Sequence, residues 1–339
     1  MYDETNKERW EMIGSLSALP LSNALALLPF LNYYNKIGFS EIELLSNFSL
    51  TRNYIHGNCY LPTFHIYNII NEISNTINVD NIGIMIPVPD NYLHLPPVIK
   101  ENILESVSFF DLFIFVSSNQ SLLGSHLNIW LEHDKDTFYI CHQRTAPHKI
   151  QGLYQGEYHR TLTIINIIRR FLGDDWKPET LYLASCIAPP HGIITMTSSG
   201  KVFNNHMYGC IPVKVSVDDI AEKVKIGQII SPNNSDPLDR IKVAVDTFIE
   251  NEDLDLSFLS DIFGCSKRSI QRILKCHGTT FQNIITQQKT AHAITLLNRD
   301  ISIINIAQKL GYSDPANFTR AFKRHTGLSP SSFRREGTV

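Results

Sequence analysis

The sequence predicts an α+β fold in which a mixed α/β region precedes an all-α domain with two helix-turn-helix units. Three observations predict it. Helical apolar stripes and a run of short β-branched or aromatic segments both occur before residue 230. The end of the chain twice repeats a short helix, a glycine turn and a second helix. Charge is also divided, because residues 257–339 carry twelve Lys and Arg against four Asp and Glu, whereas 1–256 carry eighteen against twenty-nine.

The composition is that of a globular chain with two ordinary domains. Its 339 residues are 43% hydrophobic and carry a net charge of −3. No segment approaches the roughly eighteen uncharged apolar residues of a membrane span, and the N-terminus lacks a basic start followed by an apolar block. We therefore expect a cytoplasmic protein without membrane contact. Turn-forming residues at 231–237 are expected to link a regulatory domain over 1–230 to a second domain over 238–339.

The first region is expected to contain helices and strands, and the second region to begin with a helix. Helices are indicated by apolar residues three and four positions apart, and strands by short β-branched or aromatic runs between turn residues. The predicted helices cover 23–34, 63–77, 158–172 and 238–251, and the predicted strands cover 111–118, 127–133, 137–144 and 180–188.

The first helix-turn-helix unit spans about 256–278. Leu256, Leu259, Ser260 and Phe263 form one helical stripe, the helix stops at Gly264, and Ser266 is expected to cap a second helix over 267–276. The inner face of that second helix consists of Ile270, Ile273 and Leu274. Its outer face has no acid and consists of Lys267, Arg268, Gln271, Arg272 and Lys275. Such side chains suit phosphates and the base edges of a major groove.

The second unit, about 302–327, repeats this layout. Ser302 is expected to cap its first helix and Gly311 to end it. Ser313 or Asp314 then caps a second helix with Pro315 in its first turn, where a missing N–H costs nothing. The residues expected to face inward are Phe318, Ala321, Phe322 and His325, and those expected to face outward are Asn317, Thr319, Arg320, Lys323 and Arg324. Two similar basic faces, each after a glycine turn, favour DNA binding over a merely solvated surface.

Residues 237–335 resemble the DNA-binding domain of the AraC/XylS family of bacterial transcription regulators. The resemblance rests on Ser-Lys-Arg-Ser-Ile-Gln-Arg at 266–272, on a connecting helix with Lys289, Ala293 and Leu296-Leu297, and on the motifs at 306–313, 317–324 and 327–330. It implies that two recognition helices enter adjacent major grooves of double-stranded promoter DNA.

The resemblance also implies a role for individual residues. The base-reading residues would be Arg268, Gln271, Arg272, Asn317, Thr319 and Arg320, and the phosphate-binding residues Lys267, Lys275, Lys289, Lys323 and Arg324. Two positions depart from the family pattern, since Lys289 stands where Arg is usual and Ser260 where Ala is usual. Lysine lacks the planar fork of arginine, so a bidentate contact from the connecting helix is not expected.

The N-terminal region resembles, through weaker motifs at 60–65, 81–84, 176–179 and 202–212, the arabinose-binding-domain-like sensor region of many such regulators. The resemblance implies an activator that contacts RNA polymerase, responds to a small organic effector and can form a homodimer. Cations are sparse in this acidic region, so Arg144, Arg160 and Lys201 are the candidates for an anionic group of the effector.

No motif predicts an enzyme, a metal site or a cofactor. The six cysteines form no C-x-x-C pair and are expected to be free thiols. The alternative function is a constitutive DNA-binding protein, or a DNA alkylation-repair protein with a reactive cysteine in a Pro-Cys-His-Arg motif. Residues 140–144 come close to that motif but read Ile-Cys-His-Gln-Arg. On a strand Cys141 and His142 would point to opposite sides, so the imidazole could not activate the thiol.

Overall fold

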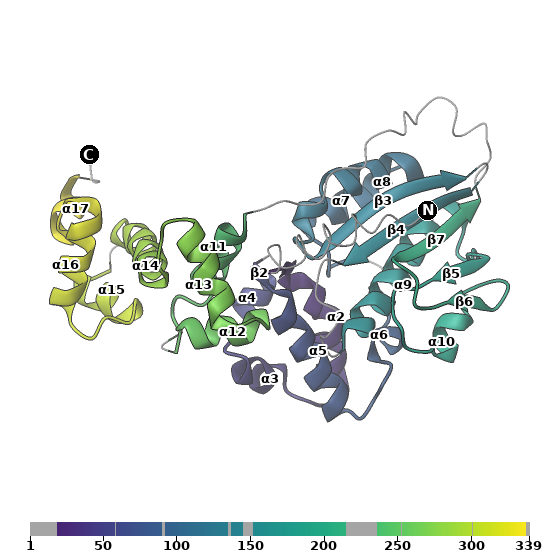
Figure 1. The fold of residues 1–339 in the computed structure, drawn as a ribbon, viewed down its shortest axis with the longest axis horizontal. Helices are drawn as coiled ribbons and strands as arrows, with labels where there is room; N and C mark the ends of the chain where they lie inside the picture. Colours follow the sequence, from purple (N-terminus) through teal and green to yellow (C-terminus); the bar gives the residue numbers. More distant parts are fainter. Residues whose placement is uncertain are drawn as a thin grey trace. The chain divides into compact units, whose positions relative to one another are not determined.

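The computed structural model describes residues 19–57, 59–89, 92–134, 137–144, 152–214, 236–251, 253–299 and 301–336. The chain divides into two compact units, Met1–Ser235 and Asp236–Val339 (Figure 1). Residues 231–235 of the expected linker lie outside the described residues. No helix of the described part is long and apolar enough to cross a membrane.

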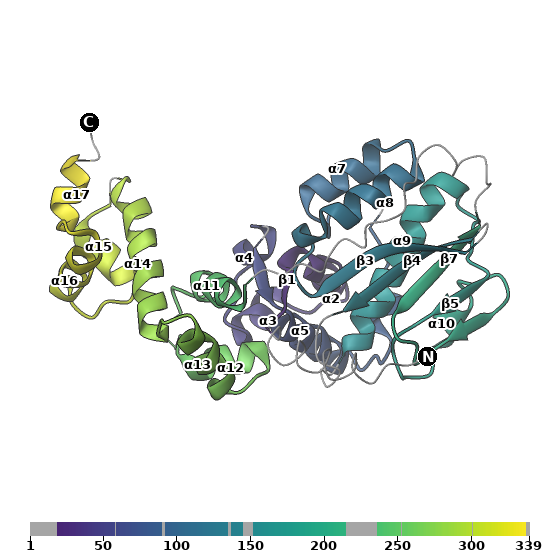
Figure 2. The same ribbon diagram turned by 45° about the horizontal axis from the view of Figure 1, so that its top comes forward.

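The main sheet of unit 1 has five described strands in the order β3-β4-β7-β5-β6 (Figure 1), and Figure 2 shows β3, β4, β7 and β5 side by side. The pairs β3–β4, β4–β7 and β5–β7 are antiparallel, and β5–β6 is parallel. The strands are β3 (Leu127–Asp134), β4 (Thr137–Arg144), β5 (Thr180–Tyr182), β6 (Lys201–Phe203) and β7 (Gly209–Lys214). A separate antiparallel pair is formed by β1 (Leu21–Asn23) and β2 (Tyr60–Pro62).

Helices cover one face of the main sheet. Alternate strand residues such as Leu127 and Ile129, or Phe138 and Ile140, join Phe113 of helix α8 (Phe109–Ser118) and other helical side chains in one apolar core. The helices and 3₁₀ turns of unit 1 are η1 (Ala24–Leu27), α2 (Leu28–Lys36), α3 (Glu41–Asn47), α4 (Arg52–His56), α5 (Thr63–Thr76), α6 (Ile82–Met85), α7 (Pro97–Glu105), α8 (Phe109–Ser118), η2 (Gln120–Leu122), α9 (Leu153–Leu172) and α10 (His191–Ile194).

The expected strand over 111–118 is wrong, because this segment belongs to α8. Ser108 caps the helix by accepting from the Asp111 amide, and the side chains buried beneath it recur at helical spacing. Those side chains are Phe109, Phe110, Leu112, Phe113 and Val116. The expected strand began at Asp111 and so excluded Phe109 and Phe110, which establish the helical period.

The other segments expected in unit 1 have the predicted type with shifted bounds. The strand expected over 180–188 ends at Tyr182, since the amides of Ala184 and Ser185 donate instead to the Glu157 carboxylate at 2.7 and 2.9 Å. Helix α9 begins at Leu153 rather than at 158, after Gly152 in a left-handed conformation (φ 72°). The helices expected over 23–34 and 63–77 and the strands over 127–133 and 137–144 are confirmed as η1 with α2, α5, β3 and β4.

Unit 2 is built of helices in the part that the structure describes. One apolar core joins Ala293 and Leu297 of the long helix α14 to Ile306 and Phe322 of the second helix-turn-helix unit. The expected first helix of this unit ends a turn early, with Phe248 as its C-cap. The helices are α11 (Pro237–Thr247), α12 (Leu256–Phe263), α13 (Lys267–Cys276), α14 (Phe281–Leu297), α15 (Ile303–Lys309), α16 (Pro315–Thr326) and α17 (Pro330–Glu336).

Candidate functional site

A tight turn joins α12 to α13. Gly264 adopts a left-handed conformation (φ 62°), and the Cys265 amide donates to the Ser260 carbonyl at 3.0 Å. The Ser260 hydroxyl donates back to the Cys265 carbonyl at 2.5 Å. The serine that departs from the family pattern therefore supplies an additional bond across this turn. Ser266 caps α13 by accepting from the Ser269 amide, as expected.

Helix α13 separates an apolar face from a cationic one. Its buried residues are Ile270, Ile273 and Leu274, as predicted. The five outer residues are all exposed, namely Lys267, Arg268, Gln271, Arg272 and Lys275. No carboxylate lies within 4.0 Å of Arg268 or Arg272 among the described residues. These cations are consequently available to a polyanion.

The second unit has the same construction. Ser302 caps α15 by accepting from the Asn305 amide, and Gly311 turns the chain at φ 66°. Asp314, one of the two caps considered, accepts from the Ala316 amide at 2.7 Å, and Pro315 occupies the first turn of α16.

The outer face of α16 presents Asn317, Arg320, Lys323 and Arg324 to solvent. Thr319 is half-buried and its hydroxyl donates to the Pro315 carbonyl at 2.9 Å. The inward placement of His325 was wrong, because this side chain is exposed. Phe322 packs edge-on against Phe333 of α17, with ring centroids 5.6 Å apart, so an apolar ring from another helix fills the core here.

Helix α14 connects the two units, and Lys289 on it has a defined place. Its ammonium lies 4.9 Å from the centre of the Tyr312 ring, just beyond the glycine turn of the second unit. Burial lowers the pKa of Lys289. The side chain is half-buried and less accessible than the other cations assigned to phosphates.

Comparison with known proteins shows which family has these two helix-turn-helix units. A family model described as a helix-turn-helix domain matches residues 259–336. The probable transcription factor PqrA of Proteus vulgaris is 35% identical over 91 residues, which make up 26% of this chain and 75% of PqrA. The chain belongs to the AraC/XylS family. It is therefore a DNA-binding transcription regulator, and such proteins are generally not enzymes.

Other AraC/XylS-type relatives match over a similar stretch. The regulator RipA of Corynebacterium glutamicum is 39% identical over 79 residues, 23% of this chain and 24% of RipA, so the match spans about a quarter of that relative. The crystal structure of the DNA-binding domain of AdpA in complex with a target DNA is 25% identical, with a TM-score of 0.27, and covers 30% of this chain and 93% of that domain.

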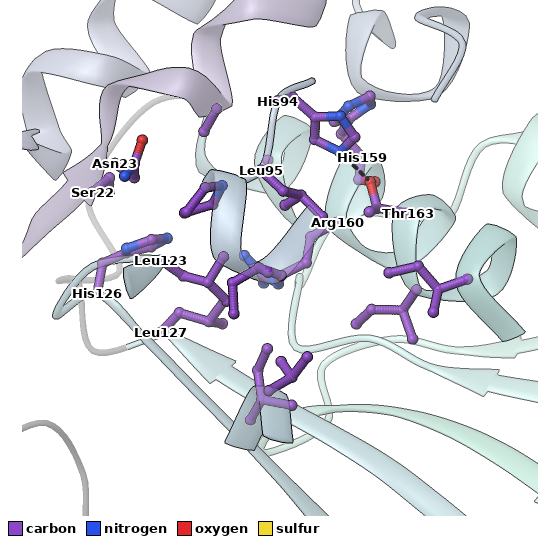
Figure 3. Close-up of a pocket in the computed structure, with 18 of the residues that line it drawn as sticks. Ser22, Asn23, His94, Leu95, Leu123, His126, Leu127, His159, Arg160 and Thr163 are labelled. Atoms are coloured by element: carbon purple, nitrogen blue, oxygen red, sulfur yellow. Dashed lines mark hydrogen bonds between the residues drawn. The ribbon is translucent and has the colours of Figure 1, made fainter. Parts of the chain in front are cut away.

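Unit 1 of this AraC/XylS-family chain contains a cavity of about 140 Å³ between its sheet and its helices (Figure 3). Of the three cations predicted to meet an effector, Arg160 on α9 lines this cavity. Lys201 is exposed at the start of β6 and is not part of the lining. Arg144 ends β4, but its side chain lies outside the described residues.

The sequence did not indicate four further polar residues of the cavity. His94, His126, His159 and Thr163 all contribute to its wall. His94 comes from a loop and His126 from the bend before β3, so only tertiary packing brings them to His159 and Thr163, which lie one turn apart on α9. Among the described residues, no three His, Cys, Asp or Glu side chains gather as metal ligands.

The environment of Cys141 disfavours the DNA-repair alternative. Its Sγ lies 3.4 Å from Sγ of Cys210 on β7, and this contact together with burial raises the pKa of the Cys141 thiol well above its usual value. A reactive cysteine needs the opposite shift and access to solvent. His142 is buried on the other side of β4, beside Arg160 and Thr161, as the strand alternation predicted.

Proposed function

We propose that this regulator activates transcription from promoters that it reads through α13 and α16, under the control of a small organic effector held in unit 1. The observation that carries the proposal is the pair of exposed, acid-free faces at equivalent positions of two helix-turn-helix units. Exposed Lys and Arg without carboxylate partners suit the phosphate backbone, and Arg, Asn and Gln suit base edges.

The assignment of roles follows position on each helix. Base reading is assigned to Arg268, Gln271 and Arg272 on α13 and to Asn317, Thr319 and Arg320 on α16. Phosphate contacts are assigned to Lys267, Lys275, Lys289, Lys323 and Arg324. The place of Lys289 over Tyr312 also suits a second task, which is to hold the turn before α16 against α14.

The control of activity is assigned to unit 1. A cavity within an α+β unit, lined mostly by apolar side chains with a few polar groups, is typical of small-molecule sites. An effector that binds one conformation of unit 1 more tightly would shift the population of the form that contacts DNA and RNA polymerase. The proposed organisation is a regulatory domain over 1–230, a linker over 231–237 and a DNA-binding domain over 238–339, with the full chain able to form a homodimer.

The proposal is tested by selecting binding sites from random duplex DNA with the full chain. We expect the selected sequences to share two short motifs about one helical turn apart, one for each recognition helix. The double variant Arg272→Ala/Arg320→Ala should select neither motif, while a Lys100→Ala variant in unit 1 should select both. Selection of a single motif, or of none, would contradict the two-helix assignment. Transcription from a promoter carrying the selected site, with and without metabolite pools, then tests effector control and its sign.

A further inference from the structure

The cavity of unit 1 has an almost entirely apolar wall. Its lining includes Phe30, Ile70, Ile103, Leu112, Phe113 and Ile164, drawn from α2, α5, α7, α8 and α9. Its volume of about 140 Å³ is close to that of an engineered protein cavity of about 150 Å³ that binds benzene. The space therefore suits a compact apolar body of about six carbon atoms.

Arg160 carries the only formal charge among the described residues that line this cavity. Its side chain extends from α9 among the lining side chains (Figure 3). Nε donates to Nδ1 of His142 at 3.3 Å, and no carboxylate of the described residues lies within 4.0 Å of the guanidinium. None of the described residues in the wall is an Asp or Glu that could balance it. A half-buried cation in apolar surroundings favours an anionic ligand.

The histidines around Arg160 do not compete with it for an anion. Burial lowers the pKa of His94 to about 3, of His126 to about 3 and of His159 to about 4, so these rings are neutral at neutral pH. The charge of Arg160 adds to the lowering at His126. They contribute hydrogen-bonding atoms, and Arg160 contributes the charge.

The ring of His94 has a buried nitrogen without a hydrogen-bond partner. The Thr163 hydroxyl donates to the His159 carbonyl at 2.9 Å, so its oxygen accepts from Nε2 of His94 at 3.4 Å. Nδ1 of His94 is then a bare acceptor, and it is buried and unpartnered. His159 is also buried, and a backbone hydrogen bond with Gly83 partly offsets the lowering of its pKa by burial. Buried polar atoms of this kind are usually satisfied, which indicates that a ligand supplies the missing groups.

We propose that the cavity binds a compact monocarboxylic acid whose carboxylate meets the guanidinium of Arg160 and whose apolar body fills the space among the helices. Arginine binds a carboxylate through two parallel N–H···O bonds, which fixes the orientation of the acid as well as its charge. A hydroxyl group on the apolar body would donate to Nδ1 of His94. This inference rests on the proposed effector control, because it names the chemical class of that effector.

The test uses the full chain with two acids, cyclohexanecarboxylate and hexanoate, each paired with its neutral amide. Binding is followed by calorimetry and by the shift of the unfolding temperature. We expect both acids to bind and both amides to bind at least tenfold more weakly, since the amide keeps nearly the size and shape of the acid but lacks its charge and has an NH2 donor in place of one acceptor oxygen. Equal affinity for acid and amide, or no binding of either acid at millimolar concentration, would overturn the inference.

Variants on α9 separate the role of Arg160 from general effects of charge. Arg160→Gln should weaken acid binding at least tenfold and abolish the preference over the amide, whereas Arg160→Lys should retain part of that preference because the charge stays and the fork is lost. Arg170→Gln is the matched control, because Arg170 is exposed on the same helix and donates to the Leu104 carbonyl outside the cavity. If a folded Arg160→Gln protein bound the acids with undiminished affinity, Arg160 would not be part of the binding site.

A transcription assay distinguishes failure of this inference from failure of the proposed function. An acid that binds through Arg160 but leaves transcription unchanged supports the ligand class and overturns effector control by that ligand. Transcription that responds to a neutral metabolite, with no acid bound, overturns the ligand class and leaves effector control in place.

Discussion

The guanidinium of Arg320 donates from Nη2 to the side-chain oxygen of Asn317, 2.5 Å away and one turn earlier on α16. Both residues are exposed and both are assigned to base reading. The bond restricts both polar side chains in the absence of DNA, so part of the conformational entropy lost on binding is already lost in the free protein.

This pairing predicts that the two residues act together. Asn317→Ala and Arg320→Ala should each weaken specific DNA binding, but the double variant should lose less than the sum of the two. The coupling energy expected for side chains in direct contact is about 0.5–3 kcal/mol. Titration of one selected duplex with all four proteins measures it, and strictly additive losses would show that the bond has no role in the complex.

Arg272 and Arg320 should each read a separate base position. We expect Arg272→Ala and Arg320→Ala to cost about 1–3 kcal/mol of specific binding each and to relax the preference at different positions of the operator. Competition with single-base variants of the operator gives both quantities. If neither variant binds more weakly, α13 and α16 are not the recognition helices.

Lys267 and Lys323 should act on DNA of any sequence. Replacement of either by Ala should weaken specific and non-specific binding alike and lower the slope of log affinity against log salt by about one. The preferred base sequence should not change. If a variant lost affinity only through one base position, the replaced lysine would be a base-reading residue and not a phosphate contact.

The fragment Asp236–Val339 should fold and bind DNA without unit 1. Each helix-turn-helix unit buries its own apolar stripe, and Ala293 and Leu297 of α14 belong to the core of the second unit. Chemical denaturation of the purified fragment should show one cooperative transition, and its operator affinity can be compared with that of the full chain. A non-cooperative transition would show that unit 1 is needed for folding.

The stability of this fragment should fall as the pH rises above neutrality. Nε2 of His292 on α14 lies 2.8 Å from the Asp246 carboxylate on α11, and this hydrogen bond raises the pKa of His292 above its ordinary value of 6.5, with Glu250 adding to the effect. A raised folded-state pKa means that the folded protein holds the proton more tightly. The stabilisation is therefore complete below the unfolded-state pKa and is lost as the pH rises through the folded-state value.

Denaturation of the fragment from about pH 5.5 to about pH 8.5 tests this expectation. Asp246→Asn should flatten the pH dependence. The slope that remains should report His277, whose pKa is also raised, first by a hydrogen bond to the Ile273 carbonyl and then by Asp236. An unchanged slope in Asp246→Asn would contradict the role of His292.

Local signals explain why some helices of unit 2 could be predicted to the residue. Helix α13 has the predicted bounds because Gly264 and Ser266 both act within one or two residues of its start. The same rules could not place β7, since Pro212 lies within it and a proline argues against an inner strand. They also could not separate strand from helix at 111–118, where a continuous apolar run suits either.

Most residues of the cavity could not be predicted from the sequence. Arg160 could be suggested because a cation on a predicted helix of an acidic region is conspicuous. His94 and Thr163 are 69 positions apart, and only tertiary packing brings them within 3.4 Å. Periodicity and capping describe neighbours along the chain, and a site assembled from several elements has no such signature.

Helix α14 is expected to set the distance between the two DNA contacts of the protein. Seventeen helical residues form a rod of about 25 Å between the two recognition units. Such a rod does not stretch, so we expect the spacer between the two short motifs of an operator to have a fixed length even where its bases vary freely. Five base pairs added to that spacer would turn the second half-motif to about the opposite side of the duplex, where α16 could not reach it while α13 stayed in place. The spacers in the promoters of this regulator should therefore vary in base sequence more readily than in the number of base pairs.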